Sequence, residues 1–131
     1  MKKGFHANIE NLTIENTDFR RVLYTADHCQ LVLMSLKPGE EIGMEVHEKV
    51  DQFFRFELGN GQVIINGFEY TVSNGDVVIV PAGSQHNVIN TSQSTDLRLY
   101  TLYSPANHLD GTIHKTKADE VEEHFDGKTS E

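Results

Sequence analysis

Short apolar runs separated by turn signals make up most of this chain from residue 19 to residue 103. The runs are rich in β-branched and aromatic residues, and they either alternate with polar residues or stop after a few positions, as β-strands do. The dipeptide Asn66-Gly67 is the favoured turn of a tight hairpin, and the segment after it alternates strictly. Strands or extended segments are expected at 19–24, 30–36, 41–47, 52–58, 63–65, 68–72, 77–80 and 97–103, with another beginning at His86. Turn signals about every ten residues predict an antiparallel all-β barrel or sandwich.

The two ends of the chain are more polar than its middle. Before about Asp18 the few apolar side chains alternate only loosely, so we expect extended chain or an edge strand there. Only residues 118–124 look helical, which predicts a short acidic C-terminal helix. The other side chains of note in the tail are His108, His114 and His124, which we expect to be exposed. One hypothesis is that this tail folds back over the barrel mouth as a lid.

Length and charge narrow the class of protein. The 131 residues suffice for one domain, which we expect to comprise a barrel core at about 19–104 and a tail at 105–131. No apolar run approaches the roughly 18 residues of a membrane helix, and the first residues lack the apolar core of a signal peptide. We therefore expect a cytoplasmic protein with no membrane partner. A net charge of −9, from 20 acidic and 11 basic residues, argues against a nucleic-acid partner. The single cysteine, Cys29, excludes an internal disulfide and a multi-cysteine zinc site, and we expect a structural thiol.

The most specific pattern in the sequence lies at residues 75–90. Gly75 supplies a turn, a β-branched run follows, and Pro81 ends that strand because it cannot donate to a ladder. Gly83 lets the chain reverse, and a second strand begins at His86.

This segment closely resembles the second signature motif of the cupin superfamily, Gly-x5-Pro-x-Gly-x2-His-x3-Asn. All five fixed positions are present, and the last of them is Asn90. The resemblance implies a small antiparallel β-barrel of the double-stranded β-helix, jelly-roll type, in which His86 points inward as a metal ligand. For Asn90 a turn or sheet role is expected rather than a catalytic one.

The first cupin motif, Gly-x5-His-x-His-x(3 or 4)-Glu-x6-Gly, is altered in this chain. Gly39, His47 and Gly59 match it, whereas Glu45 replaces its first histidine and Gln52 replaces its glutamate. The replacement keeps one carboxylate in the set of ligands, so a bound divalent ion would leave the same net charge at the site as the usual set does.

The altered motif still aims polar side chains at one place. Glu45 and His47 lie two positions apart on an extended segment, so both point the same way. Gln52 opens the next strand on the face of its apolar residues, which favours it over the rival Asp51. Together with His86 these residues predict a site for one divalent metal ion, either Fe, Mn, Ni or Zn. Gln52 would be a weak fourth ligand or a hydrogen-bond partner of a metal-bound water.

The rival interpretation is that the two replacements have abolished metal binding. Glu45 would then lie on a solvated strand end, and His86 would be an ordinary core histidine. On the last strand, Tyr103 belongs to the more apolar face, which makes its hydroxyl a candidate substrate-binding group.

Two functional hypotheses follow, and fold alone does not separate them. The leading one is a metal-dependent enzyme of isomerase, lyase or oxygenase type that acts on a small polar substrate. The alternative is a non-enzymatic small-molecule-binding or sensor barrel, with or without metal. The cupin resemblance also implies a homodimer.

Overall fold

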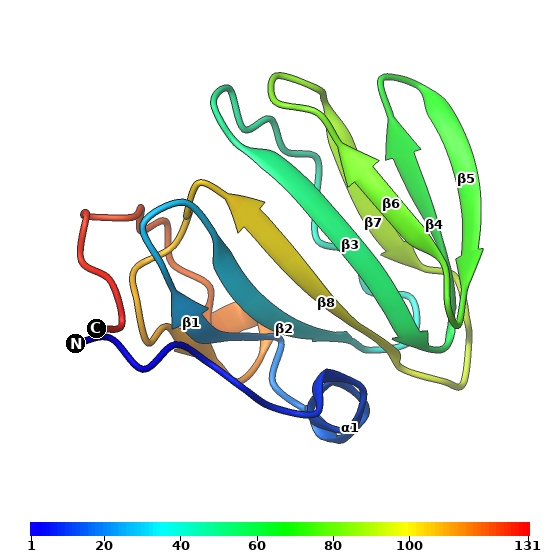
Figure 1. Ribbon diagram of the computed structural model, residues 1–131. Helices are drawn as coiled ribbons and strands as arrows, with labels where there is room; N and C mark the ends of the chain where they lie inside the picture. The colour runs from blue at the N-terminus through cyan, green and yellow to red at the C-terminus, as the bar shows by residue number, and fades with distance from the viewer.

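Most of the expected runs form strands in the computed structural model, which describes residues 1–131 (Figure 1). The strands are β1 (Arg20–Thr25), β2 (Gln30–Leu36), β3 (Asp51–Leu58), β4 (Asn60–Ile65), β5 (Phe68–Ser73), β6 (Val77–Val80), β7 (His86–Asn90), β8 (Leu97–Ser104) and β9 (Ile113–His114). The helical elements are α1 (Ile9–Glu15) and a 3-10 helix, η1 (Lys117–Asp119).

The strands form two antiparallel sheets. The larger sheet has the order β6-β3-β8-β2-β1-β9, and the smaller has the order β5-β4-β7. Strand β8 is the centre of the larger sheet, because it pairs with β2 on one side and with β3 on the other. The hairpin of β4 and β5 turns at Asn66-Gly67, as the dipeptide predicts, with Asn66 and Gly67 both at positive φ. The expected antiparallel β-fold is confirmed.

The core lies between the sheets and is built by strict alternation. Along β8 every second residue is buried, beginning with Leu97 and ending with Tyr103. Phe54 and Phe56 of β3 face the same interior, and Val63 and Val88 come from the smaller sheet. Period-two burial on both sheets is what a two-layer β-fold requires.

A close approach of two backbone segments requires glycine at position 59. Gly59, between β3 and β4, has a φ of +95°, and a β-carbon there would lie 2.3 Å from the carbonyl oxygen of Asp96. Any side chain would therefore collide with backbone as well as adopt a disfavoured conformation. This explains physically why a glycine ends β3.

The N-terminal segment forms α1, so the expectation of extended chain or an edge strand is wrong. The side chain of Asn8 caps the helix by accepting a hydrogen bond from the backbone N–H of Asn11 at 3.0 Å. Thr13 is the buried residue of this helix, and Arg98 of β8 donates to the carbonyl of Ile14. Neither helical element is long and apolar enough to cross a membrane.

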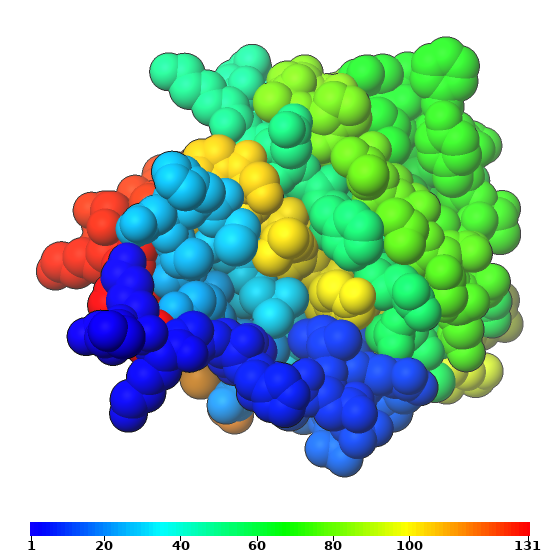
Figure 2. Space-filling view, in the orientation of Figure 1, coloured from blue at the N-terminus to red at the C-terminus, as the bar shows by residue number.

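The C-terminal tail runs back along β1 and ends beside the N-terminus (Figure 1). Strand β9 pairs with the start of β1, and the Ser130 N–H donates to the carbonyl of Thr25 at 2.9 Å. The carboxylate of Glu131 accepts from the backbone of Lys3 and Gly4, and Figure 2 shows the two chain ends in contact. The helix expected at 118–124 is only the three-residue η1, and the chain beyond it is irregular.

Candidate metal centre

The candidate ligands come from two backbone segments that pair directly. The N–H of Glu45 donates to the carbonyl of His86 at 2.8 Å, and the N–H of His86 donates to the carbonyl of Glu45 at 2.9 Å. Residues opposite each other in an antiparallel pair project from the same face. His47 lies two positions beyond Glu45, so its side chain returns to that face. The pairing therefore brings three polar side chains together.

A β-bulge in residues 41–45 sets the register of their pairing with residues 86–89. Glu41 bridges Ile89 and Glu45 bridges His86, so four positions along one segment span three along the other. Gly43 lies inside the bulge with a φ of +108°, a value that favours glycine. Bulges of this kind re-aim side chains next to functional sites. Here the extra residue is what places the carboxylate of Glu45 opposite His86.

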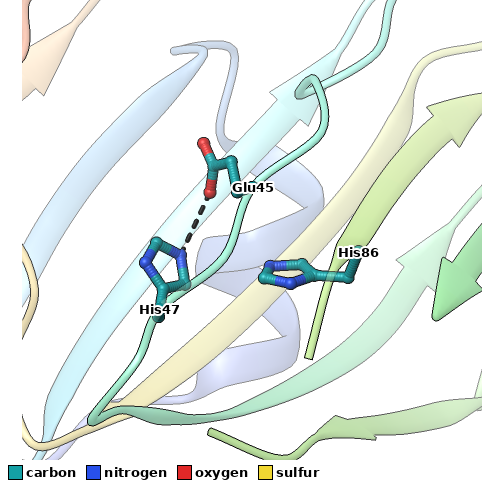
Figure 3. A group of neighbouring side chains, drawn as sticks. All are labelled: Glu45, His47 and His86. Atoms are coloured by element: carbon teal, nitrogen blue, oxygen red, sulfur yellow. Dashed lines mark ion pairs between the residues drawn. The ribbon is translucent and has the colours of Figure 1, made fainter. Parts of the chain in front are cut away.

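The three side chains converge closely (Figure 3). One ligand atom from each of Glu45, His47 and His86 lies within 4.8 Å of the others. Oε2 of Glu45 is 3.1 Å from Nε2 of His47, and the two imidazole centroids are 5.3 Å apart. Metal–ligand bonds of about 2.0–2.2 Å place neighbouring ligand atoms about 3–3.5 Å apart. The distance between Glu45 and His47 already has this value, and the three groups would draw together to hold one ion.

His86 is held in one orientation and one tautomer. Its Nδ1 lies 3.0 Å from the carbonyl oxygen of Ser84, which can only accept, so the proton is assigned to Nδ1. Nε2 therefore keeps its lone pair. The residue is only 3% exposed. Metal-bound histidines commonly donate their other nitrogen to a carbonyl in this way.

Neighbouring charges and burial set the protonation of these groups. Burial acts to raise the pKa of Glu45, but His47, with smaller contributions from Arg20 and His86, outweighs it and holds that pKa below its usual value. Burial also lowers the pKa of His86, although the Ser84 carbonyl opposes this effect. At neutral pH the centre therefore combines an ionised carboxylate with a neutral imidazole, which are the forms that bind metal.

One nitrogen in this cluster is left without a hydrogen bond. Nε2 of His47 lies 3.1 Å from Oε2 of Glu45, but this buried nitrogen makes no hydrogen bond. Buried polar atoms almost always have a partner. A cation between the two groups would satisfy both, and one carboxylate with two imidazoles is a donor set of Fe(II) oxygenases that also suits Mn, Ni or Zn. The residues present therefore fit a metal ion.

Gln52 lies on the inner face of β3, as strand parity predicts. It is 2% exposed, and its Nε2 donates to Oγ1 of Thr101 at 3.0 Å. Its Oε1 is buried with no hydrogen-bond partner, which leaves that oxygen available to a ligand. Asp51, the rival position, is exposed and accepts instead from the backbone N–H of Ala82 at 2.8 Å. A role for Gln52 toward metal stays a prediction.

Tyr103 is buried next to the cluster rather than open to a pocket. Its ring meets that of His47 edge-on at 5.9 Å, and its hydroxyl is 3.1 Å from Nε2 of His108. Burial raises the pKa of Tyr103, so the hydroxyl remains protonated. Its substrate-binding role stays a prediction, because the pocket described next is lined by other residues.

A pocket of about 480 Å³ lies beside the cluster, between the barrel and the tail. Glu45 and His47 form part of its wall, and the irregular tail segment 120–124 forms another part. The buried Arg20 of β1 also lines it. The tail and two of the candidate ligands thus line the same pocket, and a lid role for the tail stays a prediction.

The expectation of exposed tail histidines is wrong for two of the three. His114 is 7% exposed, and its Nδ1 lies 3.2 Å from the guanidinium of Arg20. His108 is partly buried against Tyr103, and only His124 is exposed. Sequence spacing carried no sign of these contacts, because they depend on the path of a tail without regular structure.

Asn90 has the structural role expected for it. Its Nδ2 donates to the carbonyls of Leu36 and Thr95, at 3.0 and 2.9 Å, and its Oδ1 accepts from the N–H of Ser92. The side chain therefore ties the end of β7 to the ends of neighbouring segments.

The fold is a small antiparallel β-barrel, and its cluster of one carboxylate and two imidazoles could hold a metal ion. A family model described as the cupin domain matches residues 32–103, and the chain belongs to the cupin family.

Similar proteins include some without a described function. The uncharacterised protein YrkC of Bacillus subtilis is 47% identical over 125 residues, a match that covers 91% of this chain and 67% of YrkC. The crystal structure of BH2720 from Bacillus halodurans has 43% sequence identity and a TM-score of 0.86, covering 89% of this chain and 92% of that one.

A third relative has a named activity. Quercetin 2,3-dioxygenase of Bacillus subtilis is 28% identical over 89 residues, which are 68% of this chain but only 26% of the dioxygenase.

Proposed function

We propose that this protein is a metal-dependent cupin enzyme of oxygenase type that acts on a small polar molecule. Glu45, His47 and His86 would hold one divalent metal ion, with Gln52 as a weak fourth ligand or a hydrogen-bond partner of a metal-bound water. The observation that carries the proposal is the convergence of one carboxylate and two imidazoles within 4.8 Å, from two directly paired segments. This donor set leaves coordination positions open, as non-haem Fe(II) oxygenases require.

When bound, such an ion supplies Lewis-acid polarisation of the substrate and a place for dioxygen. The chain's own residues prepare the centre for it. Glu45 balances part of the ionic charge, and the Ser84 carbonyl fixes the ring of His86 so that Nε2 is available. The tail segment 120–124 lines the pocket in which the substrate would lie, where it would limit the access of water.

Two observations favour the oxygenase type over an isomerase or lyase. One carboxylate and two histidines are the donor set of non-haem Fe(II) oxygenases. The similarity to quercetin 2,3-dioxygenase covers 68% of this chain. Because the chain spans only 26% of that enzyme, quercetin itself is not implied as the substrate.

The test is oxygen consumption by the iron-reconstituted protein with a panel of small enediols, 2-oxo acids and phenols. The expected result is substrate-dependent oxygen uptake by the wild type that is lost in His86→Ala and kept in a variant of the exposed His28, His28→Ala. Stoichiometric metal binding without any turnover across the panel would favour the alternative, a small-molecule-binding or sensor barrel.

The proposal includes a cytoplasmic protein that forms a homodimer and has no nucleic-acid partner. The excess of 20 acidic over 11 basic residues supports the last point. Exposed apolar side chains on the edge strands β5 and β6, namely Phe68, Val77 and Ile79, support self-association, because unpaired apolar edges tend to be covered. The mass in solution from sedimentation equilibrium tests the dimer.

A further inference from the structure

Arg20 is a buried cation in the wall of the candidate active site. Its side chain is 3% exposed, whereas the other three arginine side chains are 46%, 38% and 19% exposed. It projects from the start of β1 into the pocket that Glu45 and His47 also line. Charged side chains are rarely buried unless a partner compensates the charge. The partner of Arg20 therefore matters.

That partner is a carboxylate from the tail. Nη1 of Arg20 donates to Oε2 of Glu120 at 2.6 Å, and the same nitrogen lies 3.2 Å from Nδ1 of His114. Nε of Arg20 is buried and has no hydrogen-bond partner. A guanidinium offers five donors in a planar fork that matches a carboxylate bidentately. Glu120 therefore uses only part of the capacity of this fork.

The side chain of Glu120 is less buried than that of Arg20, the cation it neutralises. It follows η1 at the start of the irregular segment that crosses the pocket, and its side chain is 31% exposed. Its backbone N–H makes one turn contact, to the carbonyl of Lys117 at 3.0 Å. A carboxylate on such a segment can leave, provided that another anion compensates the buried charge.

We propose that Arg20 is the recognition site for the carboxylate of a small anionic substrate, and that Glu120 occupies this site until the substrate displaces it. This proposal deepens the proposed function, since the rest of the substrate would then lie toward Glu45 and His47 in the same pocket. The substrate class is a small carboxylic acid with a second polar group. Glu120 acts as an internal competitor that also keeps Arg20 neutralised in the empty protein.

The alternative is that Arg20 and Glu120 only brace the tail, and ligand binding by variants separates the two. The probe is malonate, with malonamide as its uncharged analogue, titrated calorimetrically into the full-length chain in metal-free and metal-loaded forms. The variants are Glu120→Gln, Arg20→Gln and Arg20→Lys. Glu122→Gln is the matched control, because Glu122 also lines the pocket but lies outside the contacts of Arg20.

Removal of the internal competitor should strengthen malonate binding. Glu120→Gln is expected to bind malonate at least about tenfold more tightly than the wild type, Glu122→Gln to match the wild type, and Arg20→Gln to bind at least about tenfold more weakly. Arg20→Lys keeps the charge without the fork and should also bind more weakly than the wild type. Malonate should raise the melting temperature of Glu120→Gln more than that of the wild type.

If Glu120 only braces the tail, replacing it should not strengthen malonate binding. Unchanged or weaker malonate binding by Glu120→Gln, or equal binding of malonate and malonamide, would overturn the proposal. If Arg20→Gln does not fold, the comparison of Glu120→Gln with Glu122→Gln decides alone. The gain in Glu120→Gln is expected in metal-free protein too, so a failure of metal binding would refute the metal centre and leave this site standing.

Discussion

At the scale of single residues, the segment that carries Glu45 and His47 inverts the usual pattern of a strand. Met44 and Val46 point outward and are 54% and 44% exposed, while Glu45 and His47, which alternate with them, turn inward. Placing polar groups inside and apolar groups in water costs free energy unless the polar groups have partners. The inversion therefore indicates a functional site. The backbone pairing of Glu45 with His86 places that site between the two segments.

Gln52 offers a direct test of the fourth position. The change Gln52→Glu restores the carboxylate of the usual cupin motif. Because a second anionic ligand attracts the cation more strongly, we expect metal affinity to rise by about tenfold or more. Without metal, the same variant carries an uncompensated buried charge and should lose about 2–4 kcal/mol of stability.

Metal titration and thermal unfolding with and without metal measure both effects. Asp51→Asn is the control, because Asp51 faces solvent and bonds to the backbone of Ala82. Unchanged metal affinity in Gln52→Glu would remove Gln52 from the site.

His108 should make the protein sensitive to acid. Burial lowers the pKa of His108 to about 3, so the unfolded chain takes up a proton first as the pH falls below the usual histidine value. Stability present above about pH 6.5 is then lost progressively as the pH falls toward 3. In His108→Gln the decrease in unfolding free energy between pH 7 and 5 should be smaller by about 1–2 kcal/mol.

Urea unfolding at several pH values measures this difference. His124→Gln is the control, since that side chain is exposed at 74%. An identical pH dependence in wild type and His108→Gln would contradict the buried neutral state.

At the scale of elements, the close backbone approach after β3 should make the fold sensitive to a single methyl group. In Gly59→Ala the new β-carbon would lie 2.3 Å from the Asp96 carbonyl oxygen, so we expect a loss of about 3 kcal/mol or more. Gly67→Ala is the matched control, because Gly67 has a similar positive φ of +85° but open space around it. Its cost should be about 1 kcal/mol, from the backbone conformation alone.

Denaturant unfolding of the two variants gives the comparison. Equal losses would show that the collision at Gly59 is relieved by backbone movement.

Most strands could be predicted from the sequence because their burial follows a period of two. The hairpin at Asn66-Gly67 and the alternation of β8 are the plainest cases. The apolar side chains of helix α1 are too sparse to predict a helix, and Asn8, a residue type that favours helix N-caps, is the one local signal of its start. The convergence of Glu45 with His86 was predictable because motif spacing and strand parity both report local geometry.

The contacts of the tail were beyond prediction from sequence. Arg20 and Glu120 are 100 positions apart, and no periodic pattern connects them. Their pairing depends on the route of an irregular segment over the pocket, which local propensities do not encode. Of the proposed recognition pair, Glu120 lies on that route and Arg20 lies at the start of β1, so sequence patterns alone do not bring them together.

At the scale of the whole molecule, the tail links the chain ends to the candidate metal centre. Strand β9 pairs with β1, Glu120 pairs with Arg20, and residues 120–124 line the pocket. Deleting residues 111–131 should therefore open the centre to solvent and speed metal loss to a chelator by about tenfold or more, since excluded water strengthens the site.

The rate of metal transfer to a chelator, with circular dichroism as a check on folding, measures this effect. Deletion of residues 126–131 alone is the control, because it leaves the pocket wall in place. Equal rates for the two truncations would rule out a covering role of the tail.

The central claim is that Glu45, His47 and His86 bind one metal ion, and metal content tests it most directly. Protein purified without chelator or added metal should contain close to one divalent ion per chain by elemental analysis. His47→Ala and His86→Ala should each lose most of it, and His28→Ala should retain it. Wild-type protein devoid of metal even after reconstitution, or full metal content in both cluster variants, would contradict the account.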